Sequence, residues 1–76
     1  MKLKYFGMTA EASGKDEELL DNNYSSVKEL KADLLAKYPN LLEINFKVAV
    51  NQEIVNDDYK LSGNEEIALL PPFAGG

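Results

Sequence analysis

Residues 26–38 read SVKELKADLLAKY and give the clearest structural signal in the chain. Their apolar members recur at spacings of three and four, so they share one face of a helix. They are Val27, Leu30, Leu34 and Tyr38. Ser26 and Glu29 fit a capping box at the start, and Pro39 ends the helix near Tyr38. Because one amphipathic helix must bury its apolar face against another layer, the segment predicts a helix packed across a sheet.

Five further segments predict strands, and most of them alternate apolar with polar residues as a half-buried sheet requires. They are residues 2–8, 17–21, 46–50, 53–55 and 66–70. Gly7 inside the first strand indicates a bend or the close approach of another backbone. A tight turn at Asn51-Gln52 joins the third and fourth strands, and the charged second strand suits a sheet edge. The expected fold is α+β: one domain over residues 1–76, with a mixed sheet and one main helix, in a strand order that periodicity leaves open.

Composition excludes several kinds of chemistry. A chain of 76 residues forms one domain and is too small for a deep, enclosed active site. Cysteine, histidine and tryptophan are absent, which excludes disulfides, Cys or His metal sites, a thiol nucleophile and a histidine base. Eight basic and thirteen acidic residues give a net charge of −5, which argues against nucleic-acid binding. No segment suits a signal peptide or a membrane span, so we expect a cytoplasmic protein.

Three pairs of adjacent acids are candidates for catalytic carboxylates or calcium ligands. They are Glu17-Glu18, Asp57-Asp58 and Glu65-Glu66. Neighbouring residues on a strand face opposite ways, so the two carboxylates of a pair do not converge. The chain also lacks the Asp-x-Asp-x-Asp-Gly pattern of a calcium loop. We therefore predict that these acids are solvated surface residues and that the chain holds no metal.

The last eight residues read LLPPFAGG. Pro71 and Pro72 remove two donors from the sheet, so the chain should leave it extended after the last strand. Ala74, Gly75 and Gly76 have almost no side chain, and such a tail can thread a channel too narrow for larger residues. The reacting group would then be the terminal carboxylate. The alternative is a frayed chain end without a function.

A second candidate is an apolar patch on the sheet face away from the helix. Phe6 and Met8 on the first strand, Leu70 on the last and Ile54 on the short strand can be neighbours there. With one helix in the fold this face has no cover, so the patch would suit a protein partner. The alternative is that these are isolated exposed apolar residues, which are normal on protein surfaces.

Over its whole length the chain resembles the sulfur-carrier subunits of molybdopterin synthases, within the ubiquitin-like β-grasp family of sulfur carriers. The resemblance rests on VAVNQ at residues 48–52, GNEEIA at 63–68 and PPFAGG at 71–76. It implies a β-grasp fold, in which the last strand returns to the middle of the sheet, with a flexible Gly-Gly tail. Sulfur carriers for thiamine thiazole share the fold and the Gly-Gly end but usually lack the Pro-Pro pair. The resemblance therefore favours the molybdopterin branch and leaves the thiazole carriers as the alternative.

The resemblance implies a chemical cycle on Gly76. An adenylating, activating enzyme would use ATP on its carboxylate, and a sulfur donor protein would convert the adenylate into a thiocarboxylate. The tail would then enter the large, catalytic subunit and pass its sulfur to a pterin precursor. The inserted residues would be Pro71, Pro72, Phe73, Ala74 and Gly75. The chain itself would be the non-catalytic small subunit, with no bound cofactor.

The resemblance also implies that Phe6, Ile54 and Leu70 contact the partner. Relatives often have an Arg-Glu pair where this chain has Ala10-Glu11, and a smaller aliphatic residue at the position of Phe73.

Two other functions remain open from the sequence. One is a protein modifier whose last glycine forms isopeptide bonds with lysines, and the other is an interaction module with an inert tail.

Overall fold

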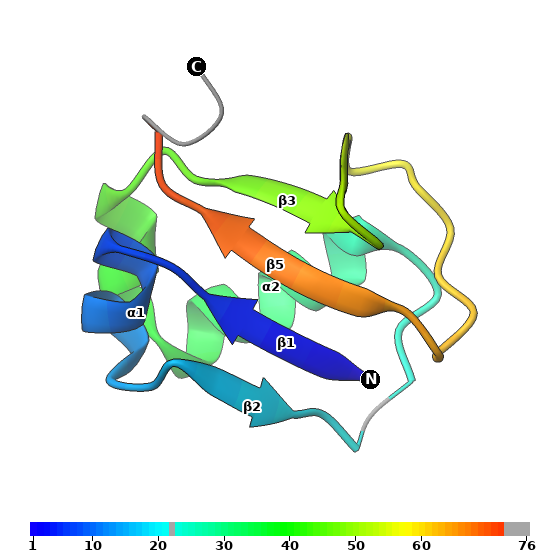
Figure 1. Ribbon diagram of the computed structural model, residues 1–76, viewed down its shortest axis with the longest axis horizontal. Coiled ribbons are helices and arrows are strands. Elements are labelled where there is room, and N and C mark those ends of the chain that lie inside the picture. The colour runs from blue at the N-terminus through cyan, green and yellow to red at the C-terminus, as the bar shows by residue number, and fades with distance from the viewer. Residues whose placement is uncertain (22, 73–76) are drawn as a thin grey trace.

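The computed structural model describes residues 1–21 and 23–72. Within them a five-stranded mixed sheet is covered on one face by helix α2 (Figure 1). The strands are β1 (Lys2–Tyr5), β2 (Glu17–Leu19), β3 (Lys47–Val50), β4 (Glu53–Val55) and β5 (Glu66–Leu70). The helices are α1 (Met8–Ser13), α2 (Val27–Lys37) and the 3-10 helix η1 (Pro39–Glu43). In this described part of the chain, no helix has both the length and the apolar character needed to cross a bilayer.

Helix α2 forms where the sequence predicts it. The side chain of Ser26 accepts the backbone N–H of Glu29 at 3.4 Å, which is half of a capping box. The other half is absent, because the Glu29 carboxylate accepts a hydrogen bond from the hydroxyl of Ser25 instead. The apolar stripe faces the sheet and is fully buried at Val27, Leu30 and Leu34. Burial of this stripe fixes which face of the sheet becomes the core.

The strand order is β2-β1-β5-β3-β4, so the last strand lies in the middle of the sheet as the resemblance implies. β5 pairs in parallel with β1, where Leu3 is opposite Ile67, and antiparallel with β3. The short, charged strand β2 lies at one edge, as predicted. In Figure 1 helix α2 lies behind the sheet, and none of the described helices covers the face in front. This uncovered face is the one on which the apolar patch is predicted.

The first strand ends earlier than the alternation predicts. The pattern indicated a strand over residues 2–8, but β1 ends at Tyr5 and the unpredicted helix α1 begins at Met8. Gly7 turns the chain between them at φ 55° and ψ −124°, a conformation that residues with a Cβ rarely adopt. A bend was one of the two predictions made from Gly7, and the structure confirms it. The residues after Gly7 were assigned to the wrong element, because they form α1 rather than the end of a strand.

The turn between β3 and β4 offers a test of backbone strain. Asn51 and Gln52 have φ values of 50° and 72°, as a two-residue hairpin turn of type I′ requires. We expect Gln52→Gly to raise the free energy of unfolding by about 0.5–1 kcal/mol, because glycine adopts positive φ without a Cβ clash. Urea denaturation measures the change. Asn51→Gly is the matched control, and it should gain less because the Asn51 side chain accepts the Glu66 N–H at 3.0 Å. A Gln52→Gly variant less stable than the parent would contradict the account.

Candidate functional site

The uncovered face of the sheet carries a hollow of about 370 Å³. Three of the side chains that line it are the predicted Phe6, Ile54 and Leu70. Phe6 is 45% exposed and Ile54 is 53% exposed, although both are large and apolar. The structure thus brings together a residue directly after β1, one from β4 and one from the end of β5. That they bind a partner stays a prediction.

Small side chains on the central strands create this hollow. Ala49 on β3 is directly opposite Ala68 on β5, and both line the hollow together with Gln52. Because alanine carries only a methyl group, the surface over these two residues is recessed relative to the larger side chains that surround it. The lining also includes a salt bridge of 3.4 Å between Lys4 and Glu66. The hollow is therefore apolar toward the end of β5 and charged toward its beginning.

Met8 does not share this site. The residue is 47% exposed, as expected for a surface contact, but it belongs to α1 and is not part of the lining of the hollow. The prediction that Met8 extends the patch along the first strand is wrong, because the chain has already turned at Gly7.

The root of the predicted tail lies beside the hollow. Strand β5 ends at Leu70, directly before Pro71 and Pro72, as the loss of two backbone donors predicts. Leu70 itself lines the hollow, so the chain leaves the sheet at its margin. The remaining predicted tail residues lie outside the part that the structure describes. They are Phe73, Ala74, Gly75 and Gly76.

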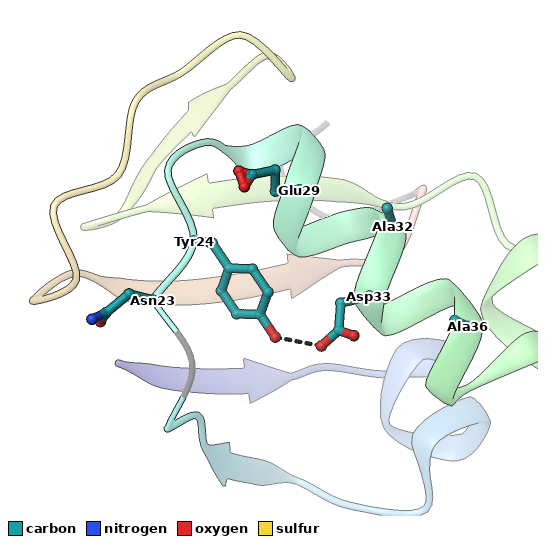
Figure 2. A pocket seen from close by; sticks show the side chains of 6 residues that line it. All are labelled: Asn23, Tyr24, Glu29, Ala32, Asp33 and Ala36. Atoms are coloured by element: carbon teal, nitrogen blue, oxygen red, sulfur yellow. Dashed lines mark hydrogen bonds between the residues drawn. The ribbon is translucent and has the colours of Figure 1, made fainter.

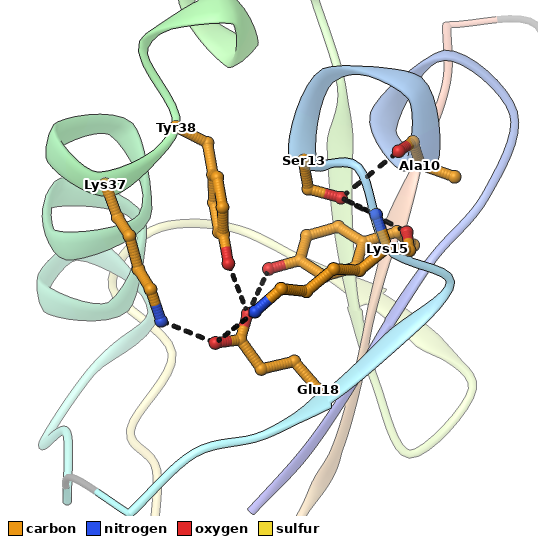
Figure 3. Close-up of polar contacts among 7 residues, drawn as sticks. Ala10, Ser13, Lys15, Glu18, Lys37 and Tyr38 are labelled. Atoms are coloured by element: carbon orange, nitrogen blue, oxygen red, sulfur yellow. Dashed lines mark hydrogen bonds and ion pairs between the residues drawn. The ribbon is translucent and has the colours of Figure 1, made fainter.

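Glu18 is not the solvated surface acid that we predict from the sequence. Its side chain is only 10% exposed, and its carboxylate accepts the hydroxyls of Tyr5 and Tyr38, both at 2.9 Å. Lys37 donates a further hydrogen bond, and Lys15 lies 3.5 Å away; Figure 3 shows Lys15, Lys37 and Tyr38 converging on the carboxylate. Burial raises the pKa of Glu18, but the hydrogen bonds from Lys37 and the two tyrosines outweigh it and lower the pKa to about 2. The cluster ties edge strand β2 to the end of α2.

This cluster makes stability depend on pH. Because the pKa of Glu18 is lowered to about 2 in the folded chain, its contribution is full above the unfolded value and is lost as pH falls from about 5 to 2. We expect Glu18→Gln to lower the free energy of unfolding by about 2 kcal/mol at pH 7 and by much less near pH 2. Urea denaturation at several pH values measures this. Glu17→Gln is the matched control, since Glu17 is exposed and forms only a 3.6 Å surface pair with Lys2. Equal effects of the two substitutions at pH 7 would refute the role of Glu18.

Glu65 also differs from the prediction. Its carboxylate accepts the backbone N–H groups of Ser62 at 2.7 Å and Gly63 at 2.8 Å, so it shapes the turn that leads into β5. Burial raises the pKa of Glu65, but these backbone hydrogen bonds outweigh it and lower the pKa to about 2. Asp57 is exposed, as predicted, and pairs with Lys31 at 3.1 Å. In residues 1–21 and 23–72 no three acidic side chains gather as metal ligands would.

A second hollow lies beside α2 and measures about 680 Å³ (Figure 2). It is larger and more open than the hollow on the sheet. The hydroxyl of Tyr24 donates to the carboxylate of Asp33 across it, and Ala32 and Ala36 form part of its wall. It lies on the helix layer, away from the root of the tail. We therefore regard the smaller hollow on the sheet as the candidate site.

Comparisons of the sequence with known proteins identify its relatives. The model of the ThiS family matches residues 3–76. The molybdopterin synthase sulfur carrier subunit of Caenorhabditis elegans is 35% identical over 81 residues, which cover 100% of this chain and 96% of that protein.

Solved structures show the same fold. The small archaeal modifier protein 1 of Methanosarcina acetivorans has a TM-score of 0.82 at 25% identity, covering 99% of this chain and 94% of that one. A chain in the protein-protein complex of subunits 1 and 2 of the molybdopterin-converting factor from Helicobacter pylori 26695 has a TM-score of 0.69 at 26% identity. That match covers 99% of this chain and 96% of the other.

Proposed function

The chain belongs to the ThiS family, and we propose that it is a sulfur carrier for molybdopterin synthesis that holds sulfur as a thiocarboxylate on Gly76. One observation carries the proposal: the full-length match to a molybdopterin synthase sulfur carrier subunit. The Pro71-Pro72 pair ahead of Gly75-Gly76 supports it, because the resemblance implies that thiazole carriers usually lack such a pair.

The proposed chemistry takes place on the terminal carboxylate. One of its oxygens attacks the α-phosphate of ATP on the activating enzyme, pyrophosphate leaves, and an acyl-adenylate forms. The outer sulfur of a persulfide on the donor protein then attacks the carbonyl carbon and displaces AMP, which is a far better leaving group than oxide. A second thiol of the donor cleaves the S–S bond of the resulting acyl disulfide, so that a disulfide forms on the donor and the thiocarboxylate stays on Gly76. The chain has no cysteine, so none of its side chains competes for the sulfur. It has no histidine either, so we assign general acid–base catalysis to the partner enzymes.

The proposed partner of the sheet face is the large, catalytic synthase subunit. Two observations support this assignment: the Helicobacter pylori relative was solved as a complex of two subunits, and the hollow exposes Phe6 and Ile54 next to the root of the tail. An apolar surface of this kind suits a protein partner. The proposal also includes a cytoplasmic location, where ATP is available for the activation step.

Reconstitution with the large subunit tests the function. The chain is prepared in thiocarboxylate and carboxylate forms, and each is mixed with the large subunit and the pterin precursor. We expect molybdopterin from the thiocarboxylate form alone. If the thiocarboxylate form yields no product while a known sulfur carrier does so in the same assay, the proposal is wrong.

Two alternatives make different predictions. A modifier, the function named for the Methanosarcina acetivorans relative, would give conjugates of higher mass in cell extracts, with Gly76 bound to lysines. A thiazole carrier would deliver its sulfur to a thiazole synthase rather than to the large molybdopterin synthase subunit. Supplying both acceptors to the same thiocarboxylated chain separates the two sulfur carriers.

A further inference from the structure

Thr9 lies where β1 and β5 stop pairing. Its side chain is completely buried, and its Oγ1 accepts the backbone N–H of Phe6 at 2.8 Å. The same oxygen lies 3.0 Å from the carbonyl oxygen of Leu69 and 2.7 Å from that of Phe6. A hydroxyl has one proton, so Thr9 shares this proton between the two carbonyl oxygens. A lone pair of the same oxygen accepts the hydrogen bond from the Phe6 N–H. The hydroxyl is thus inserted between the end of β1 and the end of β5, where a backbone ladder bond would otherwise continue.

Gly7 supports the next part of the departing chain. A Cβ built on Gly7 would lie 3.1 Å from Cγ of Pro71, so the proline ring lies against a bare backbone. Its φ of 55° independently favours glycine. Figure 1 shows α1 at the end of the sheet where β5 finishes. Leu69 and Pro71, two residues apart, are therefore both held by the short segment 6–9.

This segment also reaches the hollow. The side chain of Phe6 lines the hollow, while its backbone is bound by the hydroxyl of Thr9. The surface proposed for docking and the root of the tail consequently share one support. Neither Thr9 nor Gly7 lines the hollow, so neither is expected to contribute directly to binding there.

We infer that Thr9 and Gly7 are positioning residues, which fix the direction in which the C-terminal segment leaves the sheet relative to the hollow. The inference rests on the proposed function, in which a partner holds the hollow and receives the tail at the same time. Misplacing a reacting group by about 1 Å can cost about 100-fold in rate, so a partner bound to the hollow needs a tail that starts from a fixed point.

Thr9→Val and Thr9→Ser test the inference in the reconstituted synthase. Valine keeps the shape but removes the hydroxyl, and serine keeps the hydroxyl. For Thr9→Val we expect kcat of sulfur transfer to fall about tenfold or more, with a change of less than threefold in Kd for the large subunit. Thr9→Ser should stay within threefold of the parent in both. Hydrogen exchange at the Phe6 amide gives a readout without activity, and it should accelerate with valine but not with serine.

Leu34→Val controls for lost stability, because it shortens a fully buried core side chain on α2 and leaves the residues of segment 6–9 unchanged, and its kcat should stay at the parent value. If Thr9→Val does not fold, Gly7→Ala takes its place, with the same expected fall in kcat and a changed chemical shift of the Pro71 ring protons, because the added Cβ would lie 3.1 Å from Cγ of Pro71. If a folded Thr9→Val or Gly7→Ala chain transfers sulfur at the parent rate, the inference is wrong. The proposed function then still stands, because the parent chain transfers sulfur. A parent chain that transfers no sulfur overturns the proposed function as well.

Discussion

Deletion of Gly76 is expected to reduce activation of the chain to below about 1% of the parent rate. The shortened chain still ends in a glycine carboxylate, but that carboxylate lies about 3.5 Å short of the position where ATP is attacked. A displacement of this size removes the near-attack geometry on which the rate depends. ATP–pyrophosphate exchange with the activating enzyme measures the loss.

The control for this deletion is thermal unfolding. Among residues 1–21 and 23–72 the last strand ends at Leu70 and the last core residue is Leu69, so we expect the deletion to leave the unfolding midpoint unchanged. Gly76→Ala is a second control, because it keeps the length and adds only a Cβ. We expect it to be activated more slowly than the parent but faster than the deletion variant. Full activation of the deletion variant would show that the reacting group is not the Gly76 carboxylate.

Ile54→Asp is expected to weaken binding of the large subunit about 100-fold. Ile54 lines the hollow from β4 and is 53% exposed, so a partner that fills the hollow must cover it. Desolvating an unpaired carboxylate there, in addition to losing the apolar contact, costs about as much as a strong interface hot spot. Isothermal titration calorimetry with the purified large subunit measures the change in Kd.

Leu42→Asp is the matched control for this substitution. Leu42 is a large apolar residue that is 70% exposed, but it lies on η1 and does not line the hollow. We expect its Kd to stay within threefold of the parent and both variants to unfold near the parent midpoint. Equal loss of binding in the two variants, or no loss in Ile54→Asp, would exclude the hollow as the docking surface.

The parts of the fold that the sequence predicts well have strong local signals. Helix α2 combines an apolar stripe, a capping serine and a terminating proline, and all three act where they stand in the chain. The hairpin of β3 and β4 has its own signal in Asn51-Gln52, both with positive φ. These signals do not depend on contacts distant in the chain, so the sequence alone predicts both elements.

The elements that the sequence missed depend on contacts distant in the chain. Helix α1 has six residues, too few to show a helical period, and Thr9 stabilises its start through a carbonyl 60 residues away. Glu18 resembles any exposed acid on a strand, and its burial depends on Tyr38 and Lys37 reaching it from the end of α2. Such partners are visible only when the chain is folded.

The candidate site was predicted in part. Alternation placed Phe6, Ile54 and Leu70 on one face, and the structure brings them together in a hollow. The sequence did not single out Ala49 and Ala68, whose small size creates the hollow between two central strands. A pair of alanines carries no signal until the strand register shows that they are opposite each other.

Intact-mass spectrometry can show whether the terminal carboxylate of Gly76 carries the sulfur. The chain is incubated with its activating enzyme, ATP and a sulfur donor, and then fragmented to locate any change. We expect a mass increase equal to the replacement of one oxygen by sulfur, confined to Gly76. An unchanged mass, with no acyl-adenylate formed when the sulfur donor is left out, would contradict the proposal.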